Sequence, residues 1–314
     1  MTKACFVLAV SFALFPAARA SDQAAGVMLG VTGTVTVEHQ AGGSAQATLG
    51  MKLEPADVIA VERGGSAEVY LKGGGVVRLH DATRFTMPKA QDTAPSTASR
   101  LGSGSIAQLE SGLWVLNDPK GSLLVSPMRG DGGFDAADAP VPLTPRYEAL
   151  TGTAATFVWS GGPDKARVVV AKKREVIWKS AAVQPGTILT PGDQLPLAAG
   201  EVYTWWLEPE AGGPPLSAGM PFRVATKDVL DRTNAVETEL RRMTEAGTDE
   251  AAVDYLRIAH YAGAGSWSRV LTLTLRMPKG DARNRAFEAA TAGLRLDANT
   301  AEMLAGKLGA GANR

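Results

Sequence analysis

The chain of 314 residues contains almost no cysteine and no excess charge of either sign. Cys5 is its single cysteine, so no disulfide can form within one chain and packing alone has to stabilise the fold. The 32 basic residues are matched by 32 acidic ones, which leaves no basic excess of the kind that nucleic-acid-binding proteins carry. We therefore predict no nucleic-acid partner.

Residues and motifs that support catalysis are also scarce. The three histidines, His39, His80 and His260, are far apart and never at metal-ligand spacing, and a zinc site without cysteine would need carboxylates from scattered loops. The chain has no nucleophile elbow, phosphate-binding loop or dinucleotide fingerprint. An enzyme would need a cleft where acidic residues from different modules meet. We expect no metal, no cofactor and no enzymatic activity.

Long apolar runs are missing except at the N-terminus. There Lys3 precedes an apolar run over residues 4–15, and the small residues Ala18 and Ala20 follow it. This layout is typical of a secretory signal peptide over residues 1–20, cleaved after Ala20. The run falls short of the roughly 20 apolar residues that a transmembrane helix needs. We predict an exported protein, periplasmic or secreted, with no membrane span after cleavage.

Beyond this segment, apolar and polar residues alternate over short stretches. Val35 and Val37 face one side while Thr34 and Thr36 face the other, and glycine clusters separate the runs. Alternation with period two and glycine-rich turns are typical of antiparallel strands. Further strands are expected at residues 57–61, 67–71, 76–79 and 84–87.

Five of these segments resemble a FecR domain in order and spacing, over residues 28–88. They are Gly33-Thr-Val-Thr-Val, Leu53-Glu-Pro-Ala-Asp-Val-Ile, Gly65-Ser-Ala-Glu-Val-Tyr-Leu, Gly75-Val-Val-Arg-Leu and Thr83-Arg-Phe-Thr-Met. Two more strands, expected at 105–109 and 113–116, extend the FecR-like all-β domain to residues 28–129. The resemblance implies an antiparallel β-roll outside the cytoplasmic membrane that senses or scaffolds through protein contacts. It brings no catalytic site.

A second β module is expected after a linker over residues 130–145, which is rich in Gly, Asp, Ala and Pro. Short strand-like runs recur at 155–159, 166–171, 175–178, 202–207 and 220–224. Such spacing predicts a β-sandwich over residues 146–225. The run Leu197-Ala-Ala-Gly-Glu-Val-Tyr203 resembles the tyrosine corner of fibronectin type III-like and immunoglobulin-like domains. The resemblance implies a structural role for Tyr203, whose hydroxyl would bond to upstream backbone.

Four of the six tryptophans lie in this module, which raises the question of a glycan-stacking surface. Trp159 and Trp205 share faces with other apolar residues, so both are expected in the core, and so is Trp178. Trp206 points the opposite way from Trp205 and is the first candidate contact residue, although packing against a neighbouring module is an equal alternative. Trp114 is the second candidate.

From residue 226 to 314 the apolar period becomes helical. Val229, Val236 and Met243 recur at intervals of seven, and further helices are expected after Thr248, from Trp267 and from Asp281. Consecutive helices of this length resemble tetratricopeptide (TPR-like) hairpins, and a small helical bundle is the alternative.

These patterns predict a multidomain β plus α protein. The favoured function is a non-enzymatic periplasmic or cell-envelope FecR domain protein that acts as a protein-interaction or scaffolding module. Its helical tail would grip an envelope protein, whose identity the sequence does not reveal. The alternative is a protein that binds peptidoglycan or surface polysaccharide through Trp206 or Trp114.

Overall fold

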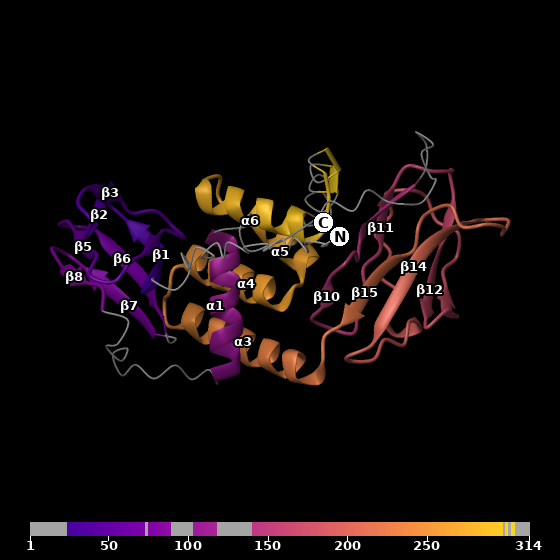
Figure 1. The fold of residues 1–314 in the computed structure, drawn as a ribbon, viewed down its shortest axis with the longest axis horizontal. Coiled ribbons are helices and arrows are strands. Elements are labelled where there is room, and N and C mark those ends of the chain that lie inside the picture. Colours follow the sequence, from indigo (N-terminus) through magenta and orange to yellow (C-terminus); the bar gives the residue numbers. More distant parts are fainter. Residues whose placement is uncertain are drawn as a thin grey trace, which may run out of the picture.

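The structure is a computed structural model that describes residues 24–72, 75–88, 103–117, 140–297, 299–300 and 303–304. The predicted signal peptide lies outside these residues. Figure 1 shows three units in a row, with a β unit at one end, helices in the middle and a second β unit at the other end. The coarse prediction of a multidomain β plus α protein is confirmed.

The first β unit consists of two four-stranded antiparallel sheets. One has the order β4 (Lys52–Leu53), β1 (Gly26–Thr32), β6 (Ser66–Leu71), β7 (Gly75–His80). The other has the order β3 (Ser44–Gln46), β2 (Val35–Glu38), β5 (Val58–Val61), β8 (Arg84–Thr86). Met28, Val37 and Ile59 are among the residues of the core between the sheets.

Gly33 carries the chain from the first sheet to the second. Its φ of +69° lies in the left-handed region that favours glycine, and a Cβ there would lie 3.0 Å from the Cα of Gly65. The alternating run around it is therefore split into β1 and β2, which belong to different sheets.

Residues 103–117 form helix α1 (Ser103–Asn117), so the prediction of strands at 105–109 and 113–116 is wrong, and the predicted all-β domain 28–129 is not all-β. Leu109, Leu113 and Leu116 recur at intervals of four and three and are all buried, which is helical spacing. They pack into the core of the helical unit. The segment is therefore a helix stabilised by its packing against the other helices, and not a pair of strands.

The central unit combines α1 with four helices from the C-terminal part of the chain, as predicted there. These are α3 (Lys227–Glu245), α4 (Glu250–Ala264), α5 (Trp267–Thr274) and α6 (Asp281–Gly293). Asp249 caps α4 by accepting a hydrogen bond from the Ala251 N–H at 2.7 Å, and Gly265 ends that helix with a φ of +71°. Among the described residues, no helix combines the length and apolar character needed to cross a bilayer.

The second β unit contains a five-stranded and a two-stranded sheet. The larger has the order β10 (Ala149–Leu150), β15 (Met220–Val224), β14 (Val202–Pro209), β12 (Ala166–Lys172), β13 (Glu175–Lys179). The smaller pairs β11 (Val158–Ser160) with β9 (Val141–Thr144). A short 3-10 helix, η1 (Gly192–Gln194), precedes β14. Strand β9 lies within residues 130–145, which were expected to form a linker, so residues 141–144 correct that prediction. This segment is a strand whose Leu143 is buried in the helical core.

Aromatic side chains fill the core of this unit. Trp159 and Trp205 are fully buried, so both core predictions are confirmed. Trp178 is only partly buried, which corrects its prediction as a core residue, because β13 is an edge strand. Its ring stacks at the margin of the core on Phe157, with 6.1 Å between the ring centroids.

One hydrophobic cluster connects the three units. Its centre is the helical unit, where α4 buries ten of its 15 residues. Val27 and Leu29 of β1 join it from the first β unit, and Leu143 and Val158 join it from the second. Strand β1 is thus buried on both faces, since Met28 belongs to the core between the two sheets. The helices are therefore a shared core and not a free tail.

Candidate binding surfaces

Trp206 lies on the outer face of the five-stranded sheet. The strand register places it opposite Val169 of β12, and Val169 opposite Lys179 of β13. Its neighbour Trp205 faces inward, opposite Val170. Trp206 is partly exposed, whereas its cross-strand neighbour Val169 is fully buried.

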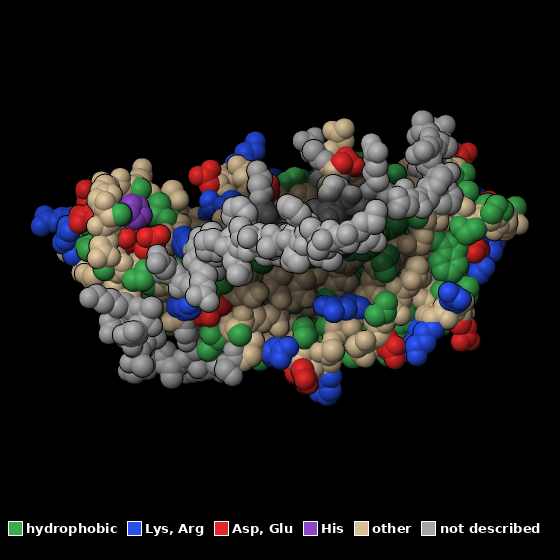
Figure 2. All heavy atoms as spheres, viewed as in Figure 1, with side chains coloured by type: hydrophobic (Ala, Val, Ile, Leu, Met, Phe, Trp, Pro, Cys, Tyr) green, Lys and Arg blue, Asp and Glu red, His purple; other side chains and the backbone are tan. Residues whose placement is uncertain are grey.

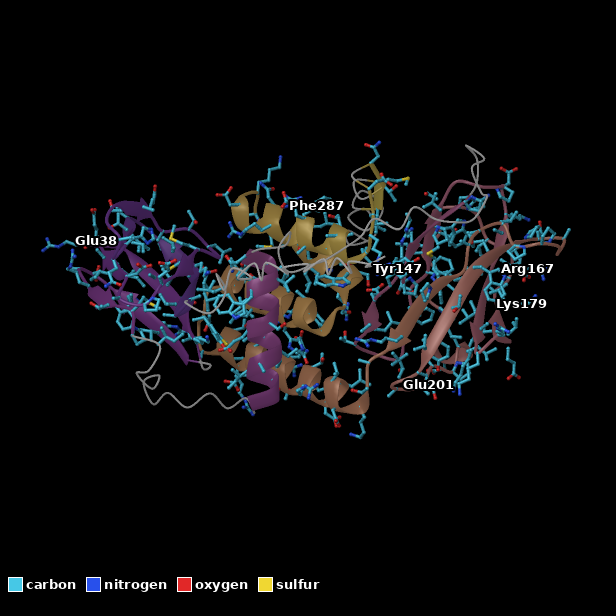
Figure 3. All side chains as sticks on the ribbon, viewed as in Figure 1. Glu38, Tyr147, Arg167, Lys179, Glu201 and Phe287 are labelled. Carbon is cyan, nitrogen blue, oxygen red and sulfur yellow. The ribbon has the colours of Figure 1, made fainter. Side chains whose placement is uncertain are left out.

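Charged groups surround this indole. The Trp206 Nε1–H donates to Glu208 Oε1 at 3.1 Å, and Lys179 Nζ donates to Glu208 Oε2 at 2.8 Å. Arg167 is opposite Glu208 on the same face, and Figure 3 labels Arg167 and Lys179 near each other. Figure 2 shows hydrophobic, basic and acidic side chains close together at this end of the molecule. We call Arg167, Lys179, Trp206 and Glu208 the Trp206 face.

The Glu208 carboxylate keeps its charge on this face. Partial burial acts to raise the pKa of Glu208, but the hydrogen bonds from Lys179 and Trp206 outweigh it, and the pKa lies below its usual value. Because the indole N–H is already hydrogen-bonded to Glu208, a ligand would contact the ring itself and the charged groups around it.

Trp114, the second candidate, lies on α1 in the helical unit. It is partly buried and packs against the hydrophobic core there. Helix α1 and strand β14 belong to different units, so the structure does not bring Trp114 and Trp206 into one site (Figure 1).

Tyr203 is buried in the second β unit and has the contact that a tyrosine corner requires. Its hydroxyl accepts a hydrogen bond from the Ala198 N–H, five residues upstream, at 2.8 Å. The ring stacks on Phe222 with 5.5 Å between the centroids.

Tyr203→Phe is expected to lower the free energy of unfolding by about 1 kcal/mol, because the Ala198 N–H loses its acceptor in the protein while the ring packing is kept. Urea denaturation followed by circular dichroism measures this change. Tyr147→Phe is the matched control, since it retains the ring over which the Arg295 guanidinium lies at 4.3 Å. Equal stability of the two variants would show that the corner bond contributes nothing.

The three histidines lie in two different units. His39 and His80 lie in the first β unit, where His39 Nδ1 is 3.3 Å from the buried carboxylate of Asp57. His260 lies on α4, where burial lowers its pKa to about 4, and its Nε2 is 3.1 Å from the Thr233 hydroxyl. His260 is therefore neutral at physiological pH and serves as a polar contact between α3 and α4.

A buried polar contact between units involves Glu148, which the sequence patterns did not indicate. Its buried carboxylate accepts hydrogen bonds at Oε2 from the Ser268 N–H at 2.9 Å and the Ser268 hydroxyl at 2.7 Å. Its Oε1 accepts from the Thr144 hydroxyl at 3.1 Å. Glu148 and Ser268 are 120 residues apart in sequence, so no local pattern could have shown the pair.

This carboxylate caps α5 from outside the helix. The helix's own cap residue, Ser266, makes no side-chain capping bond, and Glu148 receives an N–H of the first turn instead. Tyr147 lies at the same junction (Figure 3). The second β unit thus supplies a group that completes a helix of the central unit.

The first β unit has its own polar contacts with the helices. Arg78 of β7 donates to the Thr248 hydroxyl before α4, and the Arg285 guanidinium of α6 donates to the Leu49 carbonyl at 3.3 Å. Both outer units are therefore attached to the helices by hydrogen bonds as well as by the shared core.

No three His, Cys, Asp or Glu side chains within the described part of the chain gather where they could hold a metal ion. Comparison of the chain with protein-family models, with curated proteins and with solved structures found no match.

Proposed function

We propose that this protein is a non-enzymatic scaffold of the bacterial cell envelope that binds protein partners. In this proposal a FecR-like β module and a fibronectin type III-like or immunoglobulin-like sandwich are held apart by a TPR-like helical module. The supporting observation is the hydrophobic cluster that contains Val27 and Leu29 from one end and Leu143 and Val158 from the other. Units held in a fixed arrangement lose little conformational freedom on binding, which favours affinity.

The partner surfaces are assigned to the two outer β units. A helical tail that grips a partner needs an uncovered apolar face, but α4 is surrounded by α1, α3, α5 and strand β1. The second β unit instead carries exposed apolar residues beside charge, such as Val202, which has 57% of its surface exposed. The first β unit offers exposed charged residues, such as Arg84 and Glu38. Export of the chain rests on the predicted signal peptide.

A pull-down from envelope extracts with the intact mature chain tests this function. Arg84→Glu on β8 and Val202→Asp on β14 alter exposed positions of the two β units without touching a core. We expect each variant to lose a different partner that the unchanged chain retains. If the unchanged chain retains no envelope protein above a bare-resin control, the scaffold proposal is wrong.

Glycan binding is the second candidate, and the Trp206 face supports it. A partly exposed indole flanked by Arg167, Lys179 and Glu208 offers a ring for stacking on a sugar and charged groups for its hydroxyls. We expect peptidoglycan fragments to quench the tryptophan fluorescence of the intact chain, and Trp206→Ala to abolish the quenching. Trp114→Phe serves as the control. Quenching that survives Trp206→Ala would remove this face from consideration.

A further inference from the structure

A cavity of about 360 Å³ lies where the second β unit meets α5. The β unit contributes Thr144 and Thr151 to its wall, and α5 with its cap contributes Ser266, Ser268, Arg269 and Thr272. This volume falls in the lower part of the range of roughly 300–1,000 Å³ that small-molecule sites occupy. The cavity is thus large enough for a molecule of monosaccharide size.

Three of the hydroxyls on this wall donate their hydrogens to groups within the protein. Thr144 and Ser268 donate theirs to the Glu148 carboxylate, and Thr272 donates its hydrogen to the Ser268 carbonyl at 2.8 Å. A hydroxyl that has donated its one hydrogen can still accept through its lone pairs. These three groups therefore offer acceptors to a ligand, and a matching ligand must carry several O–H donors.

Arg269 differs from the hydroxyls because it can only donate hydrogen bonds, so it requires an acceptor on the ligand. Its guanidinium has only donors and a permanent charge. It is exposed, its nearest ring contact is Tyr261 with 5.8 Å from the guanidinium carbon to the ring centroid, and none of the ion pairs found among the described residues includes it. The same ligand should therefore present an anionic group to this side chain.

We propose that this cavity binds a polyhydroxylated anion of monosaccharide size, such as a sugar acid or a sugar phosphate. The ligand's hydroxyls donate to Thr144, Ser268 and Thr272, and its carboxylate or phosphate accepts from Arg269. The Glu148 carboxylate orients the wall by holding two of the three hydroxyls. The site shares no residue with the Trp206 face, so a test of one site does not decide the other.

Isothermal titration calorimetry on the intact mature chain tests this site with glucuronate, glucose 6-phosphate and glucose. We expect at least one of the two anions to bind about tenfold or more tightly than neutral glucose, because a charged hydrogen bond of about 1.4 kcal/mol corresponds to that ratio. Binding of glucuronate alone identifies a carboxylate ligand, and binding of glucose 6-phosphate alone identifies a phosphate ligand. Failure of both anions to bind at about 10 mM, well above a Kd of roughly 1 mM, would overturn the proposal.

Two variants separate this site from binding elsewhere on the surface. Arg269→Gln should weaken binding of the anion about tenfold, and Thr272→Val should weaken it while leaving the anion preference intact. Arg276→Gln is the matched control, because Arg276 is an exposed arginine just beyond the same helix and does not line the cavity. Full affinity in Arg269→Gln, or equal losses in Arg269→Gln and Arg276→Gln, would refute the assignment.

Discussion

Gly112→Ala is expected to lower the free energy of unfolding by about 3 kcal/mol, because it places a methyl group where two helices touch. A Cβ at this position of α1 would lie 1.6 Å from the Ala259 carbonyl oxygen and 2.8 Å from the Gly263 nitrogen, both main-chain atoms of α4. Gly263 makes the reciprocal approach, since a Cβ there would lie 1.9 Å from the Gln108 carbonyl oxygen. Helix α1 can therefore accept the methyl only by moving away from α4.

Gly104→Ala is the matched control for this prediction. It adds the same methyl to the same helix, but the nearest atom is Cδ of the Arg232 side chain at 3.1 Å, and that side chain can move. Its stability should be unchanged or raised by up to about 1 kcal/mol through helix propensity. Urea denaturation of both variants measures the difference. If Gly112→Ala is as stable as Gly104→Ala, the close packing of α1 on α4 is not as described.

Glu148→Ala is expected to cost about 3 kcal/mol of stability, because it leaves the Ser268 N–H and the hydroxyls of Ser268 and Thr144 without their acceptor and opens a void between two units. Glu148→Gln should cost much less. Its amide oxygen can accept from Ser268 while its NH₂ donates to the Thr144 hydroxyl. Chemical denaturation of both variants measures the contrast, and wild-type stability of Glu148→Ala would disprove the role of this carboxylate.

The same residue predicts a dependence of stability on pH. Burial raises the pKa of Glu148, and the hydrogen bonds from Ser268 and Thr144 only partly offset it. The folded protein therefore holds the proton more tightly than the unfolded chain. The resulting stabilisation is complete below the unfolded pKa of about 4.3 and is lost as the pH rises through the raised pKa of the folded state.

Comparison of the wild type with Glu148→Gln isolates this effect. The wild type should lose stability relative to the variant as the pH rises from about 4, because only the wild type can ionise at this position. Urea midpoints measured for both proteins over the same pH series give the difference directly. Parallel curves would show that Glu148 ionises as easily in the folded protein as in the unfolded chain.

Much of the local structure was predictable because its signals are local. The alternation around β5 and β6, and the opposite directions of Trp205 and Trp206, follow from the period of a strand. The partners of Trp206 were not predictable in this way. The contacts with Lys179 and Glu208 depend on β12, β13 and β14 lying side by side, which no single stretch of sequence reveals.

Helix α1 shows where local interpretation fails. Two strands were expected at 105–109 and 113–116 because they resemble a continuation that FecR domains often carry. The leucines at 109, 113 and 116 are buried only because α4, more than a hundred residues later, provides the opposing surface. The capping of α5 by Glu148 and the cavity beside it arise in the same way, from contacts between units. Sequence patterns thus predicted most elements but not the junctions that shape the candidate sites.

The central claim is that the helices hold the two β units at one separation, and single-molecule FRET tests it most directly. Cys5, the only cysteine, lies in the predicted signal peptide, so dyes can be attached to the mature chain through His80→Cys and Val202→Cys alone. Both positions are exposed, one in each β unit. We predict a single narrow efficiency distribution. A broad distribution, or several interconverting populations, would contradict a scaffold with a shared core.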